Sequence, residues 1–167
     1  MQKEHVPVTD FAEFNHVRVD IDPSVNPDVI DDIRELKEFE NESVHAVFSS
    51  HNIEHLEDQD VALALRTFWR VLVPTGIVFL MVPDFRLACE WVAQGKGEEQ
   101  IYLSGAGPIC PMDMIFGYRP WTVANPWQRH RTGFTVDSLR RKLSDAGFAK
   151  VDVREGPQFD IIAVAEK

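Results

Sequence analysis

The chain has 167 residues, enough for one domain of ordinary size and too few for two. Apolar residues make up 44% and charged residues 26%, which is typical of a globular protein. The net charge of −10 opposes binding to phosphate backbones, and no apolar run approaches 18 residues, so neither a nucleic-acid partner nor a membrane span is expected.

The front of the chain predicts short strands joined by loops. Val17–Ile21 is expected to be a strand that ends before Pro23, and Val29–Ile30 a shorter one. The interval between them is too short for a crossover helix, which needs a dozen or so residues. His5–Val8 is a weaker strand candidate because Pro7 lies inside it. A reduced α/β arrangement, with loops in place of helices, is therefore expected here.

The stretch from residue 42 to residue 84 predicts a strand, a helix and a second strand. Ala46–Ser49 is a short β-prone run, and Ile77–Val82 is an unbroken apolar run typical of a covered parallel strand. Asp58 is the expected cap of the helix between them, and Pro74 and Gly76 are its expected stop. One helix face carries the apolar residues Val61, Leu65, Phe68, Trp69 and Leu72, all expected to pack on the sheet.

The second half predicts two helices on either side of a long irregular segment. Arg86–Ala93 is expected to be a short helix, and Thr135 is expected to cap a helix that ends at Gly147. The segment 95–131 is rich in proline and aromatic residues, which indicates a lid or an insertion packed over one edge of the sheet. Val151–Val153 and Ile161–Ala165 are expected to form an antiparallel pair. The whole chain, 1–167, is thus predicted to be a single α/β domain with a mostly parallel sheet.

Five segments, in this order, resemble the class I S-adenosylmethionine-dependent methyltransferases. They are VDIDP (19–23), DIRELKEF (32–39), SSHNIEHL (49–56), RVLVPTG (70–76) and GFTVDSLRRKLSDAGF (133–148). The resemblance implies a reduced Rossmann-like methyltransferase fold and an S-adenosylmethionine cofactor. It is evidence for the fold more than for activity.

The resemblance also implies a set of cofactor-binding residues. Asp20 would accept hydrogen bonds from the two ribose hydroxyls, with Ile21 beside it in the set and Asp22 as the alternative acceptor. Asp32 would accept from the adenine amino group, and Ile33 would pack on the ring. The structural alternatives are a cap on the proline turn for the first aspartates and a solvated acidic loop for Asp32.

Ser50 and His51 follow the strand at 46–49, and ligands of open α/β sheets bind at that end. Ser50 joins the expected cofactor set, and His51 is the candidate catalytic base, because imidazole titrates near neutral pH. His51, Glu54 and His55 form an H-x-x-E-H string that also occurs in zinc peptidases. Here the string precedes the helix instead of lying within it, so no metal is expected, and Glu54 and His55 are expected to fix the loop.

One departure from the family concerns the first loop. The family has glycines there that let the backbone approach the cofactor, whereas Val6–Phe11 contains none. The glycines at Ser104–Pro108 come too late in the chain to replace them. Either the cofactor binds in an altered way, or the domain has lost it.

Two functions follow. The first is a methyltransferase for a small-molecule or glycan acceptor, held under the 95–131 segment near Tyr118, Arg119 and His130. The second is a non-catalytic module that uses exposed aromatics to bind a protein partner or a second copy as a homodimer. Cys89 and Cys110 lack CxxC spacing and the chain shows no signal peptide, so free thiols in the cytoplasm are expected.

Overall fold

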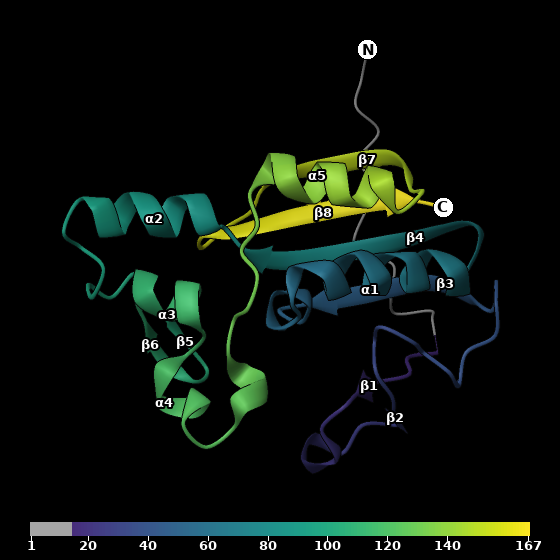
Figure 1. Ribbon diagram of the computed structural model, residues 1–167, viewed down its shortest axis with the longest axis horizontal. Helices are drawn as coiled ribbons and strands as arrows, with labels where there is room; N and C mark the ends of the chain where they lie inside the picture. The colour runs from purple at the N-terminus through teal and green to yellow at the C-terminus, as the bar shows by residue number, and fades with distance from the viewer. Residues whose placement is uncertain (1–14) are drawn as a thin grey trace.

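The computed structural model describes residues 15–167. The strand expected at His5–Val8 and the glycine-free segment Val6–Phe11 lie outside the described residues. Figure 1 shows helices on one face of a twisted sheet, and a group of short elements at one end of that sheet. The strands are β1 Val19–Asp20, β2 Val29–Ile30, β3 Val44–Ser50, β4 Leu72–Pro83, β5 Tyr102–Ser104, β6 Gly107–Ile109, β7 Ala149–Glu155 and β8 Asp160–Glu166. The helices are η2 Pro23–Val25, η3 Ile53–His55, α1 Asp58–Val71, α2 Phe85–Ala93, α3 Pro111–Phe116, α4 Arg119–Thr122, η4 Pro126–Gln128 and α5 Val136–Asp145.

The main sheet has the strand order β3-β4-β8-β7. β3 runs parallel to β4, while β8 is antiparallel to both of its neighbours. β1 and β2 form a separate parallel pair, joined by η2 and without a crossover helix, as expected. The predicted α/β fold, with parallel strands followed by an antiparallel C-terminal pair, is confirmed.

The main core lies between the sheet and the two helices α1 and α5, which cover the same face (Figure 1). Alternate residues of the two central strands point into it, because successive side chains of a strand face opposite sides. From β4 these are Val78, Leu80 and Val82, and from β8 they are Ile161, Ala163 and Ala165. β4 is therefore a central strand, as its unbroken apolar run predicts.

The boundaries of α1 differ from the expectation. Asp58 is the first helical residue and not the cap, because Glu57 holds the cap position, and its side chain makes no capping hydrogen bond. Asp58 pairs with Lys142 of α5 at 2.7 Å. The helix ends at Val71, and β4 begins at the next residue. Proline and glycine residues predict an interruption of regular structure but not its type. Here residues 74–76 form a bulge within β4.

The bulge is centred on Thr75, whose φ of 68° lies in the left-handed region. It shifts the pairing register between Val44 and Ala46 of β3. Gly76 is needed for space, because a Cβ there would lie 2.9 Å from the carbonyl oxygen of Val73 and 3.1 Å from that of His45. The unusual backbone conformation lies at Thr75 and not at the neighbouring Gly76.

Leu72 is buried in the main core, as predicted, but Trp69 is 36% exposed, so its predicted burial is wrong. Helical spacing places Trp69 at the margin of the apolar face, where its ring meets the C-terminal residue. Its indole N–H donates to the carbonyl oxygen of Gly147 at 3.1 Å, and the Lys167 ammonium lies 4.2 Å from the ring centroid. The buried face of α1 is thus narrower than the spacing of its apolar residues predicts.

The segment predicted to be irregular folds into short elements. β5 and β6 form an antiparallel hairpin, and α3 packs against α2. Ala88, Ile109 and Met114 are the buried centre of a second, smaller apolar cluster. Figure 1 shows this group below α2 at one end of the main sheet. We call residues 95–131 the insertion.

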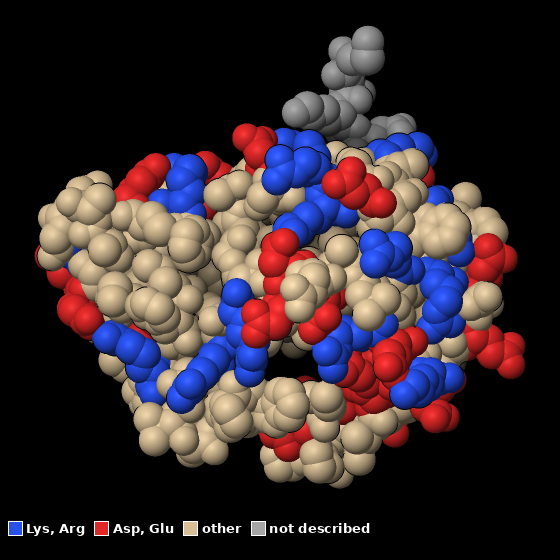
Figure 2. Space-filling model, viewed as in Figure 1, with Lys and Arg blue, Asp and Glu red and all other residues tan. Residues whose placement is uncertain are grey.

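On the face shown in Figure 2, charged side chains of both signs are interspersed over the sheet and helices, and the insertion end combines larger uncharged areas with several Lys or Arg side chains. The insertion carries exposed apolar residues, among them Leu103, Phe116, Trp121, Val123 and Trp127. Within residues 15–167, no helix has both the length and the apolar character needed to span a bilayer.

Candidate functional site

Polar side chains gather where β3 ends. Ser50 is the last residue of β3, and His51 continues the ladder by donating its backbone N–H to the carbonyl oxygen of Met81 at 2.9 Å. His51 has a φ of 52°, a left-handed conformation that costs a non-glycine residue roughly 1–2 kcal/mol. The strained residue sits at the end of a parallel strand, where α/β sheets place ligands.

The turn η3 buries the middle of the H-x-x-E-H string. Ile53 and Glu54 are fully buried, so an acidic side chain lies inside the protein directly after the strand. A distant segment secures this turn. The backbone N–H groups of Arg131 and Thr132 donate to the carbonyl oxygen of Glu54 at 2.8 and 3.1 Å, and the Thr132 hydroxyl donates to the carbonyl oxygen of Leu56 at 2.6 Å.

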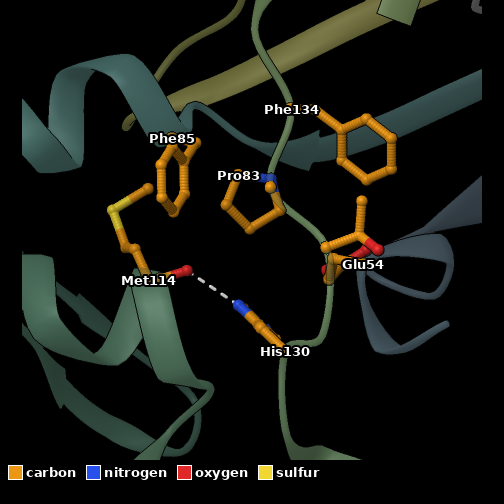
Figure 3. A pocket seen from close by; sticks show the side chains of 8 residues that line it. Glu54, Pro83, Phe85, Met114, His130 and Phe134 are labelled. Atoms are coloured by element: carbon orange, nitrogen blue, oxygen red, sulfur yellow. Dashed lines mark hydrogen bonds between the residues drawn. The ribbon is translucent and has the colours of Figure 1, made fainter. Parts of the chain in front are cut away.

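His130 comes into the site through these contacts. Its Nδ1 lies 2.7 Å from the carbonyl oxygen of Met114, and the His55 ring lies 5.0 Å from the His130 ring, centroid to centroid. Figure 3 shows Glu54, Phe85, Met114, His130 and Phe134 gathered around Pro83. Burial lowers the pKa of His130, which favours a neutral ring.

The imidazole ring of His51 lies beside the Glu54 carboxylate. The His51 Nδ1 lies 3.4 Å from Glu54 Oε1, and its Nε2 lies 3.7 Å from Asp160 Oδ1. The nearby Glu54 carboxylate raises the pKa of His51. The His51 side chain is 43% exposed, so it connects the buried carboxylates with the solvent.

Asp160, the first residue of β8, carries the second carboxylate of this group. Its own burial raises its pKa to about 6, while the nearby His51 acts in the opposite direction. The folded pKa therefore exceeds the unfolded value near 3.8. This group costs stability as the pH rises from about 4 to above 6, because the folded state must then hold a buried charge that the unfolded state holds in water.

Asp160→Asn is accordingly expected to stabilise the protein at pH 7. The difference between about 6 and 3.8 corresponds to roughly 3 kcal/mol, so we expect a gain of about 1–3 kcal/mol in the free energy of unfolding. Urea denaturation at pH 7 and at pH 4 measures it. Most of the gain should be lost at pH 4, where the folded carboxyl is largely protonated and the unfolded one, with a pKa near 3.8, is only partly ionised. An equal gain at both pH values would contradict the assignment.

The residues expected to bind the cofactor lie on separate elements. Asp20 ends β1, and its Oδ1 accepts the backbone N–H of Asp22 at 2.8 Å. Its Oδ2 has no hydrogen-bond partner within residues 15–167. Ile21 is exposed beside it, whereas Ile33 packs against the main core. Asp22 caps η2 and accepts the amide of Asn125 at 3.2 Å, which ties this loop to the insertion.

Asp32 is already engaged. Its carboxylate accepts both the Nε and an Nη of Arg34, and Arg34 also reaches Asp60 at 2.9 Å. These hydrogen bonds lower the pKa of Asp32. The carboxylate therefore holds a charge partner before any ligand arrives.

The expected acceptor residues divide between two places. Tyr118 and Arg119 line a surface cavity of about 320 Å³ together with Pro108, Asp113 and Pro120, whereas His130 lies with Glu54. The Arg119 guanidinium is held by Asp113 at 2.8 Å and Glu98 at 2.7 Å. Two carboxylates thus neutralise the cation that was expected to attract an anionic acceptor.

Comparison with known proteins shows what this chain is similar to. A family model described as "Methyltransferase domain" matches residues 9–80. No curated protein gives a significant match. Solved structures share the fold at low identity. An S-adenosylmethionine-dependent methyltransferase from Archaeoglobus fulgidus has a TM-score of 0.57 at 14% identity, over 89% of this chain and 74% of that one. One from Mesorhizobium loti has a TM-score of 0.56 at 17% identity, over 89% and 78%.

A possible exported protein from Bordetella parapertussis has a TM-score of 0.53 at 19% identity. The match covers 89% of this chain and only 52% of that protein, so the chain spans about half of its length. The front part of the chain is thus similar to a methyltransferase domain, and the chain shares the fold of solved S-adenosylmethionine-dependent methyltransferases.

Proposed function

We propose that this single domain transfers a methyl group from S-adenosylmethionine to a small-molecule or glycan acceptor in the cytoplasm. The match to the methyltransferase-domain model and the shared fold support S-adenosylmethionine-dependent methyl transfer in general. The observation that carries the proposal is the position of Asp20, whose carboxylate ends β1 and keeps one oxygen without a partner among residues 15–167. The free thiols of Cys89 and Cys110 agree with a reducing compartment.

The donor set suits the cofactor in part. A carboxylate with an unused oxygen can accept from vicinal hydroxyls, so we assign the ribose to Asp20, next to Ile21 at the end of β1, and include Ser50, at the end of β3, in the cofactor set. Ile33, which packs against the core, is proposed to lie beside the adenine. Asp32 would bind the adenine amino group with the oxygen lone pairs that Arg34 leaves unused. When bound, the cofactor supplies an electrophilic methyl group on a sulfonium.

The space for these ligands lies between three parts of the chain. Figure 2 shows a hollow bordered by the β1–β2 segment, the insertion and α1. The hydrogen bond between Asp22 and Asn125 holds the first two of these parts together. We assign the acceptor to the insertion side of the molecule, where Tyr118 and Arg119 line one cavity and His130 lies at a second place beside Glu54. Because Arg119 is neutralised, a polar uncharged acceptor such as a sugar fits better than an anion.

His51 is the proposed catalytic base. Direct methyl transfer to a hydroxyl leaves one proton to remove, and a positioned imidazole can accept it. His51 is partly exposed at the strand end and faces two carboxylates, Glu54 and Asp160, which stabilise the imidazolium that forms. Alignment of the acceptor hydroxyl with the methyl group contributes more to the rate than the base does, because the methyl group is transferred in one displacement.

Asp20→Ala is expected to weaken binding of S-adenosylhomocysteine, the product form of the cofactor, by ten- to hundred-fold. The estimate is ~1.5–3 kcal/mol, the range for hydrogen bonds to a charged group. Isothermal titration calorimetry, with thermal shift at up to millimolar ligand, measures it. Asp145→Ala, an exposed aspartate on α5, is the matched control and should bind like the wild type.

The same titration distinguishes the methyltransferase proposal from the non-catalytic alternative. If the folded wild type shows no saturable response to S-adenosylhomocysteine, the methyltransferase proposal fails, and the exposed aromatics of the insertion become candidates for a protein or homodimer interface. An Asp20→Ala variant that binds as well as the wild type would retain the function but remove Asp20 from the site.

A further inference from the structure

We propose that Glu54, His55 and His130 form a binding site for a divalent transition-metal ion of the Zn²⁺ type. One ligand atom from each residue lies within 4.8 Å of the other two. Among residues 15–167, these three are brought together by the fold, since His130 lies far along the chain from the H-x-x-E-H string. The inference goes beyond the proposed function and does not depend on it.

The first support is the state of the Glu54 carboxylate. Within residues 15–167, three fully buried side-chain oxygens have no hydrogen-bond partner, and two of them belong to Glu54. Burying an unpaired carboxylate costs several kcal/mol, so a buried charge of this kind is paired or coordinates a metal. His51 approaches only Oε1, at 3.4 Å. A metal ion bound to the Glu54 carboxylate would supply the partner that its two oxygens lack.

The second support is the orientation of the two histidines. His130 Nδ1 lies 2.7 Å from the carbonyl oxygen of Met114, and His55 Nδ1 lies 3.1 Å from that of Arg129. Because a carbonyl oxygen can only accept, each Nδ1 carries the proton and each Nε2 keeps its lone pair. Ligand histidines are held in this way, with the other ring nitrogen donating to a backbone carbonyl. Figure 3 shows the bond between His130 and Met114 as a dashed line.

The third support is the rigidity of the scaffold. The backbone N–H groups of Arg131 and Thr132 donate to the carbonyl oxygen of Glu54, so the residue after His130 is fixed to the turn that carries the other two ligands. Phe134 and Pro83 close the inner side of the pocket (Figure 3). Neighbouring ligands of a tetrahedral Zn²⁺ lie roughly 3.3 Å apart, which small side-chain rotations can reach from this arrangement.

The ligand set indicates the class of metal. Two imidazoles and one carboxylate suit Zn²⁺, Fe²⁺, Co²⁺ or Ni²⁺, whereas Mg²⁺ and Ca²⁺ prefer all-oxygen ligands. Three protein ligands leave an open coordination position, which is the arrangement of catalytic rather than structural zinc sites. That position would accept water or an oxygen of a bound ligand.

The test uses the untagged 167-residue chain, stripped of metal with a chelator. We expect ZnCl2 to raise the melting temperature saturably and CoCl2 to give visible absorption bands, with MgCl2 doing neither. Glu54→Gln, His55→Ala and His130→Ala should each weaken Zn²⁺ binding at least about tenfold by calorimetry. His45→Ala, an exposed histidine of β3, is the matched control and should bind Zn²⁺ like the wild type.

Two results would overturn the site. One is the absence of saturable Zn²⁺ and Co²⁺ binding by the folded wild type. The other is Zn²⁺ binding that survives unchanged in both His55→Ala and His130→Ala. If these variants do not fold, nitrogen NMR of the wild type still decides, because Zn²⁺ must shift the Nε2 resonances of exactly two imidazoles assigned to His55 and His130 and leave His45 unshifted. Neither outcome depends on the cofactor, so failure here leaves the methyltransferase proposal standing.

Discussion

Phe134→Ala is expected to lower the free energy of unfolding by about 3–5 kcal/mol, the range for removing a buried phenylalanine. The Phe134 ring is fully buried in the main core. Its backbone joins two parts of the fold, since its carbonyl oxygen accepts the Phe85 N–H at 3.0 Å and it forms a bridge with Asp84 at the end of β4. Truncation leaves a cavity that this hydrogen-bonded segment cannot easily close.

Urea denaturation measures the loss, and Phe116→Ala is the matched control. Phe116 is 52% exposed at the end of α3, so its removal should cost under ~1 kcal/mol. Phe134 also lines the pocket that holds Glu54 and His130. A small loss at Phe134, similar to that at Phe116, would mean that the pocket wall is looser than the structure shows.

Leu72→Ala is expected to cost about 2–5 kcal/mol, again by the transfer of apolar surface and the cavity left behind. Leu72 is fully buried at the junction where α1 ends and β4 begins, and its carbonyl oxygen accepts the Lys167 ammonium at 2.7 Å. A cavity at this junction affects both the helix and the central strand. Chemical denaturation at pH 7 measures the loss.

The control for this variant is Leu63→Ala, which makes the same chemical change within α1. Leu63 is 42% exposed, so a change of under ~1 kcal/mol is expected. Equal losses at Leu63 and Leu72 would show that the burial of Leu72 at the junction of α1 and β4 is assigned wrongly.

The elements of the fold that the sequence predicts well are those with a complete local signal. α5 has a capping box from Thr135 to Ser138 and a glycine just past its end, and both lie where expected. β4 has an unbroken apolar run, which requires cover on both faces and a central position. Such features depend on residues close together in the sequence, so they can be recognised without knowing the rest of the structure.

Other positions needed the tertiary structure because two local signals compete. Trp69 lies on the apolar spacing of α1, yet its burial depends on what stands opposite, and Lys167 and Gly147 leave it at the margin. Pro74 and Gly76 predict an interruption of regular structure, but the sequence does not show whether it is a turn or a bulge. Partner strand β3 decides it, since its register shift places the break inside β4.

The candidate site shows the same division. By itself, the sequence places Ser50, His51, Glu54 and His55 at the end of a strand, because the strand signal and the string are contiguous. It gives no sign that Glu54 is buried without a hydrogen-bond partner, that Asp160 faces His51, or that Arg119 is neutralised. These features depend on contacts that form only when the chain is folded. His130 joins Glu54 and His55 only because the backbone after it hydrogen-bonds to η3, and the charge, burial and ligand geometry of the site follow from that contact.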